Sequence, residues 1–353
     1  MLNNITIKRF IATIIGVSLL LFMSISNGLF VKFVKAQDTA GGGGGSGLSI
    51  SPTRTELSVL PGADDSVTIS LKNITSGDVV AKLYINDFEP DNNTGEPKLI
   101  TDENAHSANS IASFVSGLDD VYLAVGESKD VTLKVSVPSD AAPGGYYGAI
   151  RFKAIPAQAA ASDATGSEVS LTANLLSLVL IEVPGEITQK VAVNSIKTYL
   201  DDKSGTIFTN KPNKVGIEVE NLGNSFIKPF GTVNVTDFRG KQIFTYELND
   251  FNPRSNVLPN SKRVFLDYIE NVEKKIINDK EDETRTSPIK LPGRYTITAN
   301  VSYGNGGEVF TVKAHFWYIP SWLIVVLVVL LLGIVGLGFY LYRKYVTKKT
   351  SRR

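Results

Sequence analysis

The densest group of potential ligand atoms in this sequence lies between Asp87 and Glu96. Carboxylate or amide oxygens occur at every second position from Asp87 to Asn93, as they do at the start of a Ca²⁺-binding loop. An EF-hand loop, however, has glycine where this chain has Asn92 and glutamate where it has Lys98. Two interpretations remain: a polar hairpin loop closed by a glycine turn, which we favour, and a calcium site.

A tyrosine pair forms the second candidate. Tyr146 and Tyr147 lie inside the sequence Pro143-Gly-Gly-Tyr-Tyr-Gly148. Exposed tyrosine rings present a large amphipathic face, which would suit the sugar rings of a cell-wall glycan. In the alternative, structural interpretation, strand alternation turns one ring inward while the glycines permit a tight turn and close strand contact. We take Tyr146, Tyr147 and Asp87 as the candidate ligand-binding residues.

Catalytic and cofactor chemistry is poorly represented. The chain has no cysteine and only two histidines, His106 and His315, which are far apart in sequence. No GxSxG, HExxH or P-loop motif occurs, and the match to GxGxxG at 42–47 lies in a run of glycines with no flanking strand or helix. We therefore predict a protein that is not an enzyme and that has no cofactor and no metal. An envelope hydrolase is the least favoured alternative.

The elements that would position these residues have the pattern of short β-strands. Ser66–Leu71, Val79–Ile85 and Val131–Val137 alternate apolar and polar residues between turn residues, which predicts half-buried antiparallel strands. Leu171–Val183 is mostly apolar and predicts a central buried strand that closes a first domain. The charged stretch Glu270–Arg285 is the one helical candidate, and we interpret it as a solvated loop.

Two patterns occur in both halves of the chain. Pro-Gly-x-Tyr followed by an alternating strand occurs at 143–146 and 292–295, and strand, Asn, turn, strand occurs at 66–85 and 214–235. This repetition predicts an all-β fold with two tandem immunoglobulin-like β-sandwich domains, at 48–184 and 185–316. A Gly-rich tether at 37–47 precedes them.

The C-terminal part has the pattern of a membrane anchor. Twenty residues from Trp322 to Leu341 carry no charge, which is enough to span the roughly 30 Å hydrocarbon core of a bilayer. Arg343 and Lys344 open a basic tail, and such asymmetry predicts that the tail is cytoplasmic. We predict a transmembrane helix at 317–342, with aromatic belts that include Trp317 and Tyr318, and a cytoplasmic tail at 343–353.

The N-terminal part predicts export. Lys8 and Arg9 precede an apolar run, and small residues precede Gln37, as in a secretory signal peptide at 1–36. An uncleaved N-terminal anchor is the alternative. Residues 37–316 contain 26 of the 36 basic residues and all 35 acidic ones, which argues against nucleic acid as a partner. We predict a single-pass type I protein of the cell membrane with an extracellular ectodomain.

The order of these segments resembles the WxL-interacting proteins of Gram-positive bacterial surfaces. The matching residues are the strand ending at Pro61-Gly62, SVTISLKN at 66–73, NNTGEPKL at 92–99, PGGYYGAIRF at 143–152 and the apolar strand 171–183. The resemblance implies a first domain that binds peptidoglycan and a second that binds surface proteins. The family's Gly-Gly-Ile is Gly148-Ala149-Ile150 here.

A second resemblance involves the stretch from Ile50 to Ile85, which is similar to the first sandwich of pilus chaperones. That resemblance implies pairing of an exposed edge strand with a client protein. Together, these observations favour a membrane-anchored, non-enzymatic scaffold of the bacterial envelope that binds cell-wall glycan, surface proteins or both. The alternatives are a chaperone-like edge-strand binder and a single-pass sensor or export component.

Overall fold

The computed structural model describes residues 47–91, 94–100, 106–157, 174–277, 280–304 and 308–350. The signal peptide and nearly all of the tether predicted for 1–47 lie outside these residues, as do Asn92, Asn93 and the segment 158–173. The strands from Leu48 to Tyr318 belong to one compact unit, and the C-terminal helix belongs to another. The prediction of a mostly β protein is confirmed, because strands make up nearly all the regular structure described before that helix.

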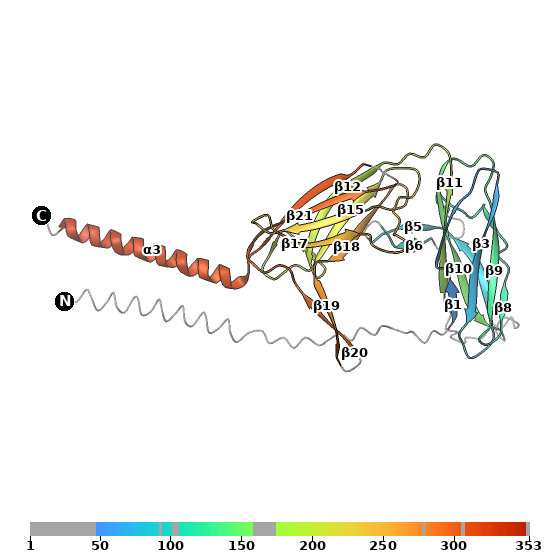
Figure 1. The fold of residues 1–353 in the computed structure, drawn as a ribbon, viewed down its shortest axis with the longest axis horizontal. Coiled ribbons are helices and arrows are strands. Elements are labelled where there is room, and N and C mark those ends of the chain that lie inside the picture. Colours follow the sequence, from blue (N-terminus) through green and yellow to red (C-terminus); the bar gives the residue numbers. More distant parts are fainter. Residues whose placement is uncertain are drawn as a thin grey trace. The chain divides into compact units, whose positions relative to one another are not determined.

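The first half of the chain forms a sandwich of two sheets (Figure 1). The four-stranded sheet has the order β1 (Leu48–Ser51), β3 (Asp64–Asn73), β9 (Ser128–Ser136), β7 (Val115–Ser116). The five-stranded sheet has the order β2 (Arg54–Ser58), β11 (Asn174–Val183), β10 (Gly144–Pro156), β4 (Val79–Asn86), β8 (Val121–Leu123). A short hairpin, β5 (Phe88–Pro90) and β6 (Pro97–Leu99), is inserted after β4.

The second half repeats the order of the five-stranded sheet and three strands of the four-stranded one, in which β12, β15 and β18 take the places of β1, β3 and β9. Its four-stranded sheet is β13 (Lys203–Gly205), β12 (Val191–Leu200), β15 (Lys214–Asn221), β18 (Ser261–Tyr268). Its five-stranded sheet is β14 (Ile207–Phe208), β22 (Phe310–Tyr318), β21 (Gly293–Ser302), β16 (Phe230–Thr236), β17 (Gln242–Leu248). In both copies the last strand of the sandwich pairs in parallel with a short early strand, β2 with β11 and β14 with β22.

Alternation explains why these segments form sandwiches. In β3, Val67, Ile69 and Leu71 are buried in the core, while Thr68 and Ser70 between them face outward and bond the neighbouring strand β9. Each sandwich has its own apolar core drawn from both of its sheets. The period-two prediction is confirmed for these strands.

The repeated Pro-Gly-x-Tyr pattern forms the same corner twice. The Tyr146 hydroxyl donates to the carbonyl oxygen of Ala142 (3.0 Å), and the Tyr295 hydroxyl donates to that of Leu291 (2.6 Å). A tyrosine near the start of such a strand that bonds the backbone a few residues upstream is typical of immunoglobulin-like sandwiches.

The repeated asparagine also has one role in both copies. Asn73 and Asn221 end β3 and β15, and both side chains are fully buried. Each amide donates to the carbonyl oxygen four residues ahead, at Gly77 and Ser225 (2.8 Å in both copies), and each side-chain oxygen accepts from the backbone two residues ahead. The buried amide thus closes the turn that follows the strand.

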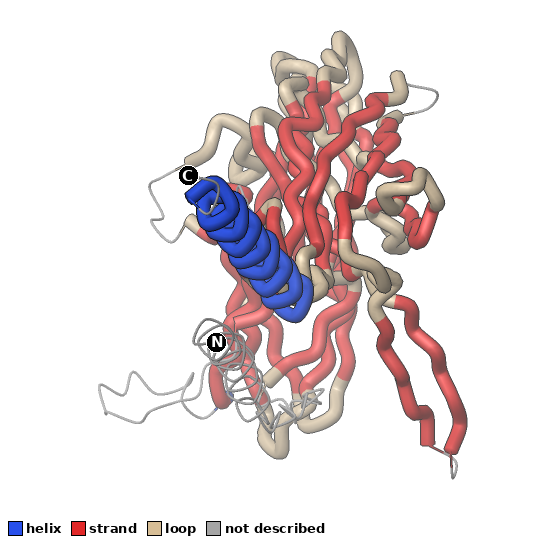
Figure 2. Tube along the Cα trace, turned by 90° about the vertical axis from the view of Figure 1, so that its left-hand side faces the viewer, coloured by secondary structure: helices blue, strands red, loops and turns tan. Residues whose placement is uncertain are grey.

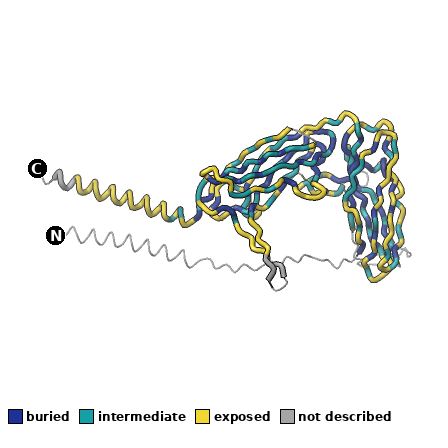
Figure 3. Tube along the Cα trace, in the orientation of Figure 1, coloured by how far each residue is buried: buried dark blue, intermediate teal, exposed yellow. Residues whose placement is uncertain are grey.

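The charged stretch 270–285 differs from both interpretations of its sequence. It is neither a helix nor a loop but a hairpin of two strands, β19 (Asn271–Ile277) and β20 (Lys280–Thr286). Figures 2 and 3 show it extending from the second sandwich, and the residues near its base are exposed. Opposite charges face each other across it, as at Lys274 and Glu283 (3.2 Å), and such pairs favour the extended form.

The C-terminal helix α3 spans Ser321–Thr350 and includes Trp322, Leu341, Arg343 and Lys344. In the described part of the chain, its residues Ser321–Tyr345 are the one helical segment long and apolar enough to cross a membrane. The predicted start at residue 317 is wrong. Trp317 lies in β22 and pairs with Arg294 of β21, and Tyr318 is buried in the core. The sheet therefore continues to Tyr318, and the helix begins after Pro320.

Candidate functional site

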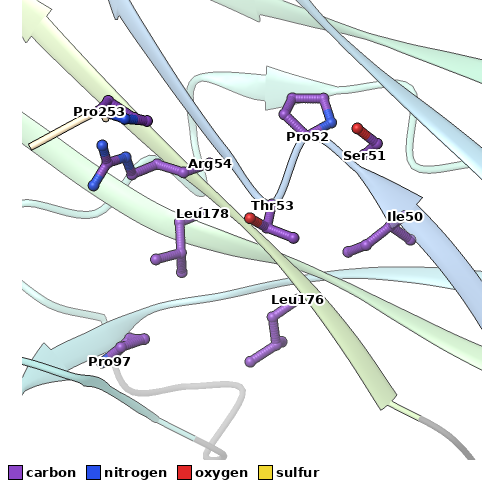
Figure 4. A pocket seen from close by; sticks show the side chains of 9 residues that line it. All are labelled: Ile50, Ser51, Pro52, Thr53, Arg54, Pro97, Leu176, Leu178 and Pro253. Atoms are coloured by element: carbon purple, nitrogen blue, oxygen red, sulfur yellow. The ribbon is translucent and has the colours of Figure 1, made fainter. Parts of the chain in front are cut away.

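The candidate site arises where the chain changes sheets. After β1 in the four-stranded sheet, the chain turns at Ser51-Pro52 and enters the five-stranded sheet as β2. An open groove of about 670 Å³ lies at this turn (Figure 4). We call it the β11 edge groove. Its lining comes from the turn, β6, β11 and a loop of the second sandwich: Ile50, Ser51, Pro52, Thr53, Arg54, Pro97, Leu176, Leu178 and Pro253.

The groove exists because β2 covers only part of the edge of β11. Strand β2 pairs with Leu178 to Glu182 and leaves the edge of Asn174 to Ser177 without a hydrogen-bonded partner strand among the described residues, although the end of β1 lies close by. The backbone N–H of Leu178 donates to the Thr53 carbonyl oxygen (2.9 Å). Because backbone groups alternate sides along a strand, the N–H and C=O of Leu176 point the same way, into the groove.

Apolar side chains flank this edge. Leu176 and Leu178 are half-buried on the outer face of the sheet, where they pack against a cluster that contains Phe88, Tyr147 and Leu180. Pro52 and Pro97 lie on opposite sides of the groove (Figure 4). An unpaired backbone edge beside apolar side chains can take up an extended peptide segment, because the backbone supplies hydrogen bonds and the side chains supply pockets.

Arg54 is the charged residue of the lining, and it is held on two sides. Its Nε lies 3.3 Å from Glu56 Oε1, and its Nη2 donates to the Arg254 carbonyl oxygen (3.0 Å). Glu56 also accepts from Lys228 and, at 2.8 Å, from Asn256, so β2 is tied to loops of the second sandwich. Burial favours a higher pKa for Glu56, but the hydrogen bonds and the charges of Lys228 and Arg54 outweigh it and lower that pKa.

Further contacts join the two sandwiches near the other end of β11. The backbone N–H of Gly145 donates to the Asn224 carbonyl oxygen (2.8 Å), and the Ser225 hydroxyl donates to Glu182 (2.6 Å). A Cβ on Gly145 would lie 3.0 Å from the Phe226 ring, so glycine allows this close approach. These contacts hold the second sandwich against the first at β10 and β11.

The three residues predicted to bind a ligand are linked to each other through one loop. Asp87 is buried and accepts from the backbone of Ser107 (2.8 Å) and the hydroxyl of Ser110 (2.6 Å). Asn109 of the same loop bonds the backbone of Gly145 and Tyr147. Asp87 thus positions the loop that supports the start of β10.

Neither tyrosine ring lies open at the surface. Tyr146 forms the corner described above and packs on Phe114, with ring centroids 4.9 Å apart. Tyr147 is buried against Phe88 at 5.0 Å, and burial raises the pKa of its hydroxyl. Binding of a ligand by Tyr146, Tyr147 or Asp87 remains a prediction.

No group of three or more His, Cys, Asp or Glu residues in the described part of the chain is arranged to hold a metal ion. The proposed calcium loop includes Asn92 and Asn93, which lie outside that part. In the described portion of this hairpin, the backbone N–H of Gly95 donates to the Asp91 carbonyl oxygen (2.7 Å), as expected of a closing turn.

Sequence reasoning missed Leu176, Leu178 and Glu56. The mostly apolar run 171–183 predicts a central buried strand, whereas its described part, 174–183, has a partly open edge. The available signal was Ser51-Pro52 between two strand-like segments, since proline marks sheet edges and changes of direction.

No protein-family model matches this chain, and no curated protein matches it either. Solved structures with related backbones include the class 5 fimbriae chaperone CfaA, which is 12% identical with a TM-score of 0.36 and covers 77% of this chain and 99% of that one. The E. coli chaperone DraB is 14% identical with a TM-score of 0.34, over 75% of this chain and 96% of that one. Identities and scores this low say nothing about ligands, so the function proposed next depends on the chain's own geometry.

Proposed function

We propose that this chain is a membrane-anchored, non-enzymatic binding protein whose two immunoglobulin-like sandwiches hold a site for an extended protein segment. The supporting observation is the unpaired edge of β11 from Asn174 to Ser177, flanked by Leu176 and Leu178. Four residues of strand span about 13 Å, which is room for a short segment that continues the line of β2. The helix α3 would keep this site at the cell membrane, with the sandwiches outside.

The equivalent edge of the second sandwich supports this assignment by contrast. Strand β22 occupies the place of β11, and its short neighbour β14 pairs only with Trp317 and Tyr318. Thr311 and Lys313 stand exposed on β22, at the positions where the first sandwich has Leu176 and Leu178. Charged residues on an edge strand discourage pairing with other chains. Under this proposal the first sandwich has the binding edge, and the second has a protected edge.

The test is selection of short random display peptides on the full chain held in lipid nanodiscs. We expect enrichment of peptides with apolar residues at every second position, because alternate side chains of an added strand face the sheet. The variant Leu176→Pro removes an edge N–H that no described strand uses. It should weaken binding about ten-fold, which corresponds to one or two backbone hydrogen bonds.

The matched control is Lys313→Pro in β22. The backbone N–H of Trp317, four residues further on, donates to the Thr206 carbonyl oxygen of the neighbouring segment. Because N–H groups alternate sides along a strand, the N–H of Lys313 faces the same edge. Lys313→Pro should leave peptide binding unchanged. Equal loss of peptide binding in both variants, or enrichment of peptides without alternating apolar residues, would contradict the proposal that the β11 edge is the binding site.

A second candidate is the binding of cell-wall peptidoglycan by the first sandwich, and its support is the sequence resemblance to WxL-interacting proteins. Under this proposal the full chain in nanodiscs sediments with protein-free peptidoglycan over a range of salt concentrations. Leu176→Pro should not change that sedimentation, because glycan binding needs no strand edge. Failure to sediment would leave surface proteins as the partner class.

A further inference from the structure

The second sandwich continues into the apolar helix with almost no linker. Strand β22 ends at Tyr318 and α3 begins at Ser321, so only Ile319 and Pro320 lie between them. Tyr318 is a core residue and pairs with Phe208 and Gly293. Three residues of extended chain span at most about 10 Å. If α3 spans a membrane, as proposed above, this end of the sandwich must lie at the lipid headgroups.

Large apolar side chains are exposed at this end. Ile207 is 65% exposed and Trp317, its register partner, is 46% exposed. Phe238, at 56%, lies against Gly293, where a Cβ would come within 2.8 Å of the ring. Leu291, two residues before Gly293, is 41% exposed. Exposed aromatic and aliphatic side chains that gather at one end of a domain mark an interaction surface.

The same end is basic in an otherwise acidic ectodomain. The segments 201–214, 237–241, 267–270 and 287–294 contain seven basic and five acidic residues, whereas 37–316 as a whole has 26 basic and 35 acidic. Arg239 lies over the Phe238 ring, 5.5 Å from its centroid, and is held by Asp237 at 2.7 Å. The hairpin β19–β20 also extends from this end, and its residues are not included in these numbers.

We propose that this end of the second sandwich binds the surface of the bilayer that α3 enters. The contact, here called the lipid-facing end, comprises Ile207, Phe238, Leu291 and Trp317 with Arg239 and Arg294. Its aromatic rings enter the headgroup layer and its guanidinium groups bind lipid phosphates. Anionic lipids strengthen the contact. This inference depends on the proposed anchor.

The test uses tryptophan emission, because the chain has only two tryptophans, Trp317 and Trp322. In a Trp317→Phe, Trp322→Phe background, Phe238→Trp places a single reporter at the lipid-facing end. Phe251→Trp is the control, since Phe251 is 65% exposed and follows the other end of β17. Both full-length variants are placed in nanodiscs of phosphatidylcholine and phosphatidylglycerol that contain a headgroup spin label.

We expect at least two-fold quenching for Phe238→Trp and little for Phe251→Trp. Adding Arg239→Glu and Arg294→Glu, or replacing phosphatidylglycerol with phosphatidylcholine, should reduce the quenching. A circular-dichroism melt checks that each variant is folded.

Equal, weak quenching of both reporters would overturn the inference. A chain with Trp317→Phe that keeps Trp322 then separates the two ideas. Quenched Trp322 would mean that the helix is inserted and only the lipid contact is wrong. Unquenched Trp322 would mean that the anchor itself is wrong.

Discussion

At the scale of single residues, the most informative groups are the two corner tyrosines. Tyr295 is 1% exposed and stacks on Phe316 while its hydroxyl reaches the Leu291 carbonyl oxygen. Tyr146 makes the same backbone bond in the first sandwich. The repetition shows that one local device starts the equivalent strand in both copies.

Tyr295→Phe should therefore lower the free energy of unfolding by about 1 kcal/mol, the usual net value of one such bond. The loss would appear as a lower midpoint in a urea titration with unchanged slope. Tyr303→Phe is the control, since that ring is half-buried and stacked on Phe310 and should keep its packing. Equal losses in both variants would mean that the corner bond contributes nothing special.

The tyrosine pair also shows which properties of a single residue can be predicted from the sequence alone. Alternation predicts that Tyr146 and Tyr147 point to opposite faces, and they do, since they join different clusters. Alternation does not reveal that the outer face is covered, because Phe88 and Leu258, which share a cluster with Tyr147, are distant in sequence. Contacts over such separations leave no local pattern.

At the scale of elements, the hairpin β19–β20 stands apart. Its side chains are exposed at Val272–Lys274 and Glu283–Thr286, and surface ion pairs such as Lys274–Glu283 contribute at most about 1 kcal/mol. Isolated hairpins are marginally stable. The hairpin therefore adds little to the stability of the sandwich from which it extends.

Replacing 271–286 with a short Gly-Ser turn should leave the melting temperature within a few degrees of the full chain. The replacement is feasible because Asn271 and Thr286 are register partners, about 5 Å apart as in any ladder. Circular dichroism measures the result. A large drop would show that the hairpin supports the core.

The elements themselves were largely predictable. Alternating strands, the strand that follows each Pro-Gly-x-Tyr repeat and the apolar helix all follow from local patterns in the sequence. The hairpin was not predicted, because Glu and Lys favour helices locally and its extended form depends on cross-strand pairing. The end of β22 was misplaced because Trp317 and Tyr318 suit a membrane interface as well as a strand.

At the scale of the whole molecule, Glu56 joins the two sandwiches. Its pKa is lowered in the folded chain, so its contribution to stability is present above the unfolded pKa and is lost as the pH falls through the folded pKa. The ordinary value is 4.5, so the loss belongs below that pH. No local sequence pattern pointed to this contact, because its partners lie in the other half of the chain.

Glu56→Gln should therefore destabilise the chain by roughly 1 kcal/mol near neutral pH, as for partly exposed ion pairs. The difference from the unmodified chain should shrink as the pH falls below 4.5. Thermal melts of both chains across this range provide the measurement. A difference that is constant with pH would assign the effect to packing and not to the carboxylate charge.

The buried amide of Asn73 has a consequence for producing this protein. Asn73-Ile74-Thr75 is an acceptor sequence for N-linked sugar in cells that glycosylate secreted chains, and there the sugar is attached to the nascent polypeptide. In the folded chain the same amide nitrogen is enclosed by the carbonyl oxygens of Gly77, Leu123 and Ala124. A yeast or mammalian secretory pathway would thus modify the atom that must later become inaccessible, and each chain so marked would be diverted to quality control before its first sandwich closed.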